Sequence, residues 1–462
     1  MEVELMNAID VLAQHVAWTR YEELPEPATA AARKFILDTI GVGLLGSAGP
    51  WVEELITAQG VQPASGGARV LGRPVRLGMS SAALCNAYQM HNCEFDCVHE
   101  GAVVHAVTCV LAVSLAEIDR LHFEFGTAVP GHRLIQAVTL GVDVACCLGV
   151  ACTTGLRFFR PGTCGAFGAT AALAVLRGFD PDRLVSAFGI VHGQLCGTMQ
   201  AHTEGSPLLG MQMGFSARNA VMACDLAGLG VPGPRDVLEG PFGYFALFEG
   251  EHNLGQVLSD LGRIWRITEI AHKPFPSGRA THGIVDACLA LRREHSIDVT
   301  RVSRVTARVP ALINHLVGRQ VSDDMDINYA RLCARFAAAR VLIAGDLVFE
   351  DFSEAGRRDP DTLAVAQRVD IEIDGNPDPN ALTPLTVEIE CHGGERFGKQ
   401  IDTVYGHPSN PMRRSAWLDK FRHNWCLAAS TLEAAACERV IECLENLHEV
   451  SDSAVIIDDL VP

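Results

Sequence analysis

The sequence predicts a mainly α protein with an α+β second domain. Three observations support this fold class. Apolar residues recur at helical spacing over the first 265 or so residues, strand-like alternation begins after about residue 261, and helical spacing returns from 410 to 450. The 462 residues suffice for two to four domains. We therefore expect a large helical domain, a smaller α+β domain, and C-terminal helices that pack back onto the first domain.

Glycine and proline separate a succession of expected helices in the first part of the chain. One start is especially clear, because Asp180 can cap a helix whose first residue is Pro181. Strand patterns are nearly absent from this part. The expected helices cover residues 6–15, 27–45, 51–57, 80–90, 106–118, 132–147, 164–176, 181–193 and 214–227.

Alternating apolar and polar residues mark the second part of the chain. Val387, Ile389 and Cys391 would share one face of a strand. A run of Asp, Gly, Asn and Pro at 374–379 predicts a turn between strands. The expected strands are 302–309, 368–373 and 385–391, and the expected helices are 281–293 and 329–344.

Composition limits the class of function and partner. Acidic residues exceed basic ones by 18, which disfavours nucleic acid and anionic membrane surfaces. The apolar stretch 135–152 contains Gln136, Thr139 and Asp143, so we expect a buried helix there and no membrane span. Met1 to Asp10 lacks the features of a secretory signal, and the sixteen cysteines are scattered. We therefore expect a cytoplasmic protein with reduced thiols.

The densest polar cluster lies at residues 91–105, between two expected helices. It contains three histidines, three carboxylates and two cysteines. A carboxylate beside an imidazole can tune proton transfer near neutral pH, so the cluster is a candidate for general acid or base catalysis. The alternative is a solvated polar connection. A zinc site is a further alternative, but the cysteine and histidine spacing fits no familiar zinc pattern, and we expect no metal.

Three further segments carry candidate site residues. Residues 271–282 place Lys273, one of only four lysines, in a stiff Pro-x-Pro turn where the helical pattern gives way to the mixed α+β pattern. The alternative is a plain surface linker. Residues 158–168 form a glycine-rich turn before a helix, where close helix packing explains the glycines equally well. Residues 197–210 include His202 and Glu204, either in a site or in an ordinary loop. Walker and Gly-x-Ser-x-Gly motifs are absent.

Taken in order, these segments resemble the MmgE/PrpD family over most of the chain. Residues 94–105 match the family loop Asp-Phe-Asp-Asp-Thr-His-x-Gly-x-x-x-His without a gap. Residues 273–276 match its Lys-Pro-Tyr-Pro segment and are followed by Arg279, and residues 410–412 match a late Asn-Pro-Met segment. The resemblance implies a helical domain at 1–268, an α+β lid domain at 269–404 and completing helices at 405–462.

The resemblance also implies a homodimer without a cofactor, and a small di- or tricarboxylate substrate bound between the domains. His105 would exchange a proton next to a carboxylate, while Lys273 would stabilise the developing charge. The catalytic candidates are His105, Lys273, Glu94 and Asp96. The substrate-binding candidates are Arg160, Arg279, His99, Glu204 and His282.

Four positions depart from the family pattern. Val98 replaces a threonine, Arg160 stands where a histidine is usual, Leu209 falls where many members have a lysine, and Phe336 falls where some have a tyrosine. Arg160 can hold a carboxylate but cannot donate a proton near neutral pH. The function expected is a lyase, in the first place a hydro-lyase (dehydratase), with a decarboxylase or an epimerase as alternatives. A non-catalytic carboxylate-binding protein is the rival.

Overall fold

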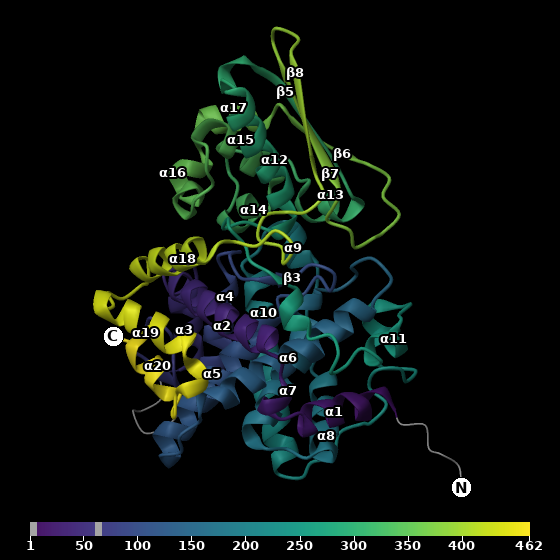
Figure 1. The fold of residues 1–462 in the computed structure, drawn as a ribbon, viewed down its shortest axis with the longest axis vertical. Coiled ribbons are helices and arrows are strands. Elements are labelled where there is room, and N and C mark those ends of the chain that lie inside the picture. The colour runs from purple at the N-terminus through teal and green to yellow at the C-terminus, as the bar shows by residue number, and fades with distance from the viewer. Residues whose placement is uncertain (1–6, 61–66) are drawn as a thin grey trace.

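The computed structural model describes residues 7–60 and 67–462 and consists of a large helical domain beneath a smaller α+β domain (Figure 1). The predicted fold class is confirmed. The first residue of the expected helix 6–15 lies outside the described residues, and α1 covers Ala8–Trp18. One apolar cluster fills the helical domain and a second, centred on β5, β7 and α15, fills the α+β domain.

Five helices form the centre of the helical domain, and most of their residues are buried. By length and composition α6 is long and apolar enough to cross a membrane. The helices α2 and α3, which are bent by 91° relative to each other, reach that length and apolar composition only when they are counted as one span. In α6 the most apolar window is 94% buried within the protein, as expected of a core helix. The five are α4 (Met79–His91), α5 (Ala106–Phe125), α6 (Gly131–Ala151), α7 (Arg160–Arg177) and α10 (Leu208–Gly228).

Several helix boundaries differ from the prediction. Asp180 caps α8 as expected, accepting a hydrogen bond from the Arg183 amide at 2.8 Å. However, α7 already begins at Arg160, so residues 160–168 are helical and do not form a turn. A Cβ on Gly168 would lie 2.5 Å from the Gly141 carbonyl oxygen, so close packing on α6 explains this glycine. The surrounding helices are α2 (Glu26–Ser47), α3 (Val52–Gln59), α8 (Pro181–His192), α9 (Gln200–Glu204) and α11 (Leu254–Leu258).

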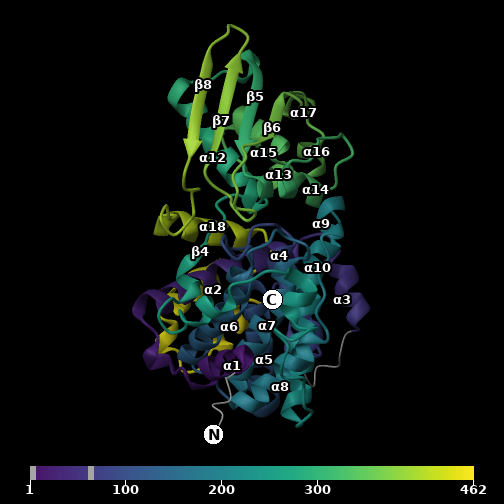
Figure 2. The same cartoon turned by 90° about the vertical axis from the view of Figure 1, so that its right-hand side faces the viewer.

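The C-terminal helices return to the helical domain. They are α18 (Arg414–Cys426), α19 (Ala434–Glu445) and α20 (Ala454–Asp459). Both views show α18 lying across the junction between the two domains (Figures 1 and 2). Phe421 and Leu444 belong to the apolar cluster of the helical domain. The α+β domain is therefore an insertion in the helical one.

A four-stranded mixed sheet in the order β6-β5-β7-β8 forms the α+β domain. The alternate residues of β7 are buried, which confirms the predicted shared face. The edge strand β8 was not predicted, because its side chains alternate only between exposed and half-buried. The expected helix 329–344 divides into α14 and α15. The strands are β5 (Val302–Val309), β6 (Val369–Ile373), β7 (Leu385–Cys391) and β8 (Arg396–Ile401). The helices are α12 (Arg279–His295), α13 (Ala311–Val317), α14 (Ile327–Arg331), α15 (Ala334–Ala344), α16 (Glu354–Arg357) and α17 (Pro360–Ala366).

Two pairs of very short strands lie in the helical domain. The first joins β1 (Ala68–Arg69) to β2 (Arg76–Leu77). The second pairs β3 (Val98–His99) antiparallel with β4 (Ile270–Ala271). Because β3 belongs to the polar cluster at 91–105 and β4 ends two residues before Lys273, this pairing brings the two candidate segments together.

Candidate active site

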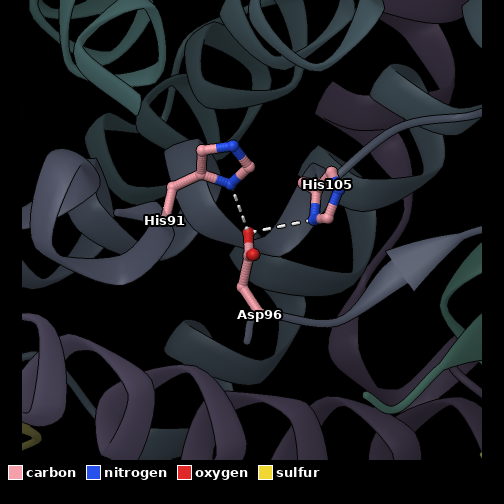
Figure 3. A group of neighbouring side chains, drawn as sticks. All are labelled: His91, Asp96 and His105. Atoms are coloured by element: carbon pink, nitrogen blue, oxygen red, sulfur yellow. Dashed lines mark hydrogen bonds and ion pairs between the residues drawn. The ribbon is translucent and has the colours of Figure 1, made fainter. Parts of the chain in front are cut away.

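Asp96 joins two histidines at the centre of the polar cluster (Figure 3). Its Oδ2 atom lies 2.9 Å from Nδ1 of His91, the last residue of α4, and 3.0 Å from Nδ1 of His105, the residue before α5. Thr108, in the first turn of α5, donates a hydrogen bond to the same oxygen at 2.7 Å. Two core helices thus fix both imidazoles on one carboxylate.

The shared carboxylate sets the protonation of both rings. Oδ2 of Asp96 accepts a hydrogen bond from Nδ1 of His91, whereas Nδ1 of His105 lies 3.0 Å from the same oxygen as an ion-pair contact. We therefore assign a proton to each Nδ1 and leave each Nε2 directed away from Asp96. Burial raises the pKa of Asp96, but His105 and His91 outweigh it and hold that pKa well below its ordinary value. Burial lowers the pKa of His91, but Asp96 outweighs it, so the net shift is upward. Burial, helped by Lys273, lowers the pKa of His105.

Lys273 is fully buried and paired with Glu94. Its Nζ atom donates to Oε2 of Glu94 at 3.0 Å and to the Glu94 carbonyl oxygen at 3.1 Å, and lies 3.8 Å from Oδ1 of Asp96. Glu94 has a φ of 52°, in the left-handed region. In this conformation its main-chain oxygen and its side-chain Oε2 atom both accept from the Lys273 ammonium group. Burial raises the pKa of Glu94, but Lys273 and the two histidines lower it to about 2.

The C-terminal helix α18 supports this cluster from the side of the helical domain. Lys420 donates to the Phe95 carbonyl oxygen at 2.9 Å, lies 3.9 Å from the centre of the Phe95 ring, and pairs with Asp38 at 2.8 Å. The main chain beside Asp96 is therefore anchored to α2 and α18. Lys420, which follows the late Asn-Pro-Met segment, thus has a supporting position behind the cluster.

A cavity of about 80 Å³ lies beside the histidines, between the helical and α+β domains. Polar groups and apolar groups both line it, and the apolar ones come from both domains. The polar lining consists of His91, Glu94, Glu100, His105, His202 and Arg279. The apolar lining includes Leu156, Met199, Leu209, Leu316, Leu332 and Leu382.

The structure brings five of the predicted residues together. His105, Lys273, Glu94 and Asp96 form one buried cluster, and Arg279 lines the adjoining cavity. Arg279 is itself held tightly. It donates to Glu100 at 2.7 Å and to the main-chain oxygens of His272 and Tyr405 at 3.1 and 2.8 Å.

Arg160 and Glu204 lie elsewhere. Arg160 is fully buried and forms an ion pair with Glu249 at 2.9 Å, and it also donates to Asn380 of the α+β domain at 3.2 Å. Its guanidinium group is therefore occupied by the protein, although its neighbours Phe159 and Pro161 line the cavity. Glu204 is exposed at the end of α9, while His202 of the same helix lines the cavity.

His99 and His282 have partners within the protein. Nε2 of His99 contacts Oε2 of Glu269 at 2.9 Å, and its Nδ1 accepts from the Ala102 amide at 3.1 Å. His282 is fully buried in α12, with Nδ1 3.2 Å from Nη1 of Arg279. His99 thus supports the loop, and His282 lies behind Arg279.

Sequence reasoning missed His91 as a second imidazole on Asp96. The signal was present, because His91 belongs to the polar cluster and lies five positions before Asp96. Among the departures from the family pattern, Val98 and Leu209 line the cavity. Phe336 instead packs on Phe352 in the core of the α+β domain.

The expectation of no metal stays a prediction. The ligand atoms of His91, Asp96 and His105 lie within 4.8 Å of one another, a spacing that a metal ion could bridge. Their direct contacts of 2.9 to 3.0 Å have hydrogen-bond length, however, and Thr108 already occupies the shared oxygen. We expect elemental analysis of the dialysed protein to find less than one tenth of a metal ion per chain. A stoichiometric ion lost on His91→Gln would contradict this expectation.

The fold and the site define the class of protein. The chain belongs to the MmgE/PrpD family, because the model of the MmgE/PrpD N-terminal domain matches residues 10–256 and that of the C-terminal domain matches residues 275–446. The family expectation drawn from the sequence motifs is therefore confirmed.

Curated relatives cover nearly the whole chain at about one quarter identity. The cis-aconitate decarboxylase of Mus musculus is 25% identical over 98% of this chain and 93% of its own length. That of Aspergillus terreus is 26% identical over 95% of this chain and 92% of its own length. The cis-aconitate decarboxylase of Homo sapiens is 25% identical over 98% of this chain and 94% of its own length.

Proposed function

We propose that the protein is a cofactor-independent lyase that removes carbon dioxide from a small di- or tricarboxylic acid. The observation that carries this proposal is the pair of imidazoles on Asp96, both of which line a cavity between two domains. The names of the relatives add support, since each is a decarboxylase of a small tricarboxylate. This choice places the decarboxylase before the dehydratase that the sequence motifs suggested first.

The proposed reaction needs one proton donor. The bond between a carbon atom and its carboxylate breaks, carbon dioxide leaves, and the electron pair stays on that carbon or on a conjugated neighbour. Protonated His91 or His105 then donates the proton from Nε2 to this carbon, and water restores the imidazolium. Because Asp96 stays ionised, it stabilises the imidazolium before transfer. An apolar wall beside the departing carboxylate favours its conversion to a neutral product.

A dehydratase is the second candidate, and one observation favours it. The two histidines have opposite pKa shifts: burial lowers that of His105, whereas Asp96, working against burial, raises that of His91. A neutral base beside a protonated acid is the pair that proton abstraction and loss of hydroxide require. An epimerase would need the same proton abstraction without loss of a group.

A substrate panel tests the proposal. We expect the purified full-length chain to release carbon dioxide from cis-aconitate or a related acid in deuterated water, with one deuteron entering the product as seen by NMR. Loss of water without carbon dioxide would select the dehydratase. Ligand-induced thermal stabilisation without exchange or conversion would contradict both and select the carboxylate-binding rival.

The pH dependence of kcat separates the two enzymatic candidates. A decarboxylase with a protonated His91 as donor loses activity as pH rises through the His91 pKa, which the Asp96 charge shifts upward from 6.5 despite burial. A dehydratase also needs neutral His105, so its kcat falls again at low pH, below 6.5, where that base becomes protonated. We therefore expect one falling limb for decarboxylation, and a bell-shaped profile would contradict it.

The homodimer and the cytoplasmic location expected from the sequence are carried forward as proposals. Light scattering of the purified chain would test the dimer, with a mass near twice 49.6 kDa as the expected result. Fluorescence microscopy of the tagged chain in its own cells would test the location.

A further inference from the structure

The cavity contains few positive charges for a polycarboxylate. Among its lining residues, all of which belong to the described parts of the chain, Arg279 alone is an arginine or lysine. Glu100 already pairs with the Arg279 Nε atom, and Nη1 donates to two main-chain oxygens. Nη2 has only a 3.5 Å contact with the Val404 carbonyl oxygen, so this nitrogen can take one carboxylate.

Neighbouring cations lie outside the cavity lining. Lys273 lies behind Glu94 and is neutralised by it. Arg319 donates to the main-chain oxygen of His202 at 3.0 Å, and Arg331 donates to that of Asn92 at 2.7 Å. Nη1 of Arg319 and the Nε and Nη2 atoms of Arg331 have no hydrogen-bond partner among the described residues, but neither arginine lines the cavity. Burial and nearby Arg319 lower the pKa of His202 to about 4, so its ring is neutral at pH 7. A third carboxylate would therefore have no cation of its own.

The remaining wall is apolar on both sides of the cavity. Leu209 in the first turn of α10 and Met199 before α9 come from the helical domain. Leu316 of α13, Leu332 and Leu382 face them from the α+β domain. A carboxylate buried here would lose its hydration without gaining a partner, whereas an alkyl group would gain by burial.

We propose that the substrate is a dicarboxylate with a short alkyl group where a tricarboxylate has its third carboxylate. One carboxylate binds Nη2 of Arg279, and the other lies beside the two histidines and leaves as carbon dioxide. The alkyl group packs between Leu209 and the leucines of the α+β domain. This proposal rests on the lyase function proposed above and narrows its substrate class.

The test compares cis-aconitate with 3-alkylglutaconates, in which methyl, ethyl or propyl replaces the central carboxylate. Both the CH2–carboxylate that leaves and the conjugated carboxylate that takes up its electron pair are kept in these compounds. We expect kcat/KM for carbon dioxide release to rise about threefold to fourfold per methylene, and the ethyl compound to exceed cis-aconitate at least tenfold. A higher kcat/KM for cis-aconitate would overturn the substrate class and leave the decarboxylase intact. If no acid releases carbon dioxide, the decarboxylase proposal fails, and thermal shifts with the same acids decide which class the cavity binds.

Variants of the wall provide the matched comparison. We expect Leu209→Lys to lower kcat/KM for the alkyl dicarboxylates and raise it for cis-aconitate, reversing the preference. Leu208→Lys is the control, because Leu208 is 41% exposed on the same turn of α10 and should change neither value. Leu316→Lys places the charge on the wall formed by the α+β domain and should act like Leu209→Lys. An unchanged preference in both wall variants would contradict the proposal.

Discussion

Asp96→Asn is expected to reduce kcat by about 10² to 10⁴-fold. Three groups converge on one oxygen of Asp96: Nδ1 of His91 and the Thr108 hydroxyl donate to it, and Nδ1 of His105 makes an ion-pair contact with it. An asparagine amide could not accept from all three and would turn its own N–H group toward one of them. The histidines would then change tautomer, so the proton would move from Nδ1 to Nε2. Steady-state kinetics on the substrate identified by the panel would measure the loss.

A neighbouring variant separates chemistry from packing. Thr108→Val removes one hydrogen bond to the same oxygen but keeps the charge and both imidazoles, so we expect a stability loss of about 1 kcal/mol and kcat within a few-fold of the parent. Asp96→Asn should also lower the His91 pKa, because the main group that raises it is lost, and shift the falling limb of the profile to lower pH. Equal kcat in Asp96→Asn and Thr108→Val would refute the role of Asp96.

Lys273→Met is expected to lower the free energy of unfolding by about 3–5 kcal/mol. The Lys273 side chain is fully buried, and its removal leaves Glu94 and Asp96 as neighbouring buried carboxylates without their shared cation. Burial, no longer opposed by the largest favourable charge, should then raise the Glu94 pKa from about 2. Urea denaturation with matched slopes would measure the change.

Two comparisons make this second prediction specific. Lys399 pairs with Glu294 at the surface, where their side chains are 35% and 49% exposed, so Lys399→Met should cost at most about 1 kcal/mol. Adding Glu94→Gln to Lys273→Met should recover part of the loss, because the unpaired charge disappears. Equal losses in the free energy of unfolding for Lys273→Met and Lys399→Met would show that the buried ion pair stabilises the protein no more than the surface pair does.

Periodicity predicted most of the fold and failed where neighbours set the structure. The helices and the alternation of β7 could be predicted because burial on one side of an element makes apolar residues recur at regular spacing in the sequence. The edge strand β8 has no buried face, so the pairing of its main chain with β7 could not be seen from composition. The break between α14 and α15 likewise lies within continuous helical spacing.

The candidate site was predicted in its chemistry and only partly in its geometry. Glu94, Asp96 and His105 lie within twelve positions of one another, so their spacing alone was enough to group them. Arg160 shows the limit, because its partner Glu249 lies 89 positions away and no local pattern links them. A buried ion pair and an open anion site use the same residue type, and only the fold distinguishes them.

The insertion of the α+β domain has a consequence for synthesis. That domain is one continuous stretch with its own core and can condense as soon as it leaves the ribosome. The helical domain must wait, because Leu444 and Ile457 complete a core that began with Ile9. Lys420 also secures the loop of Asp96 only at that late stage. The second domain to be translated is thus the first that can mature, and the loop that carries Asp96 is among the last parts to become fixed.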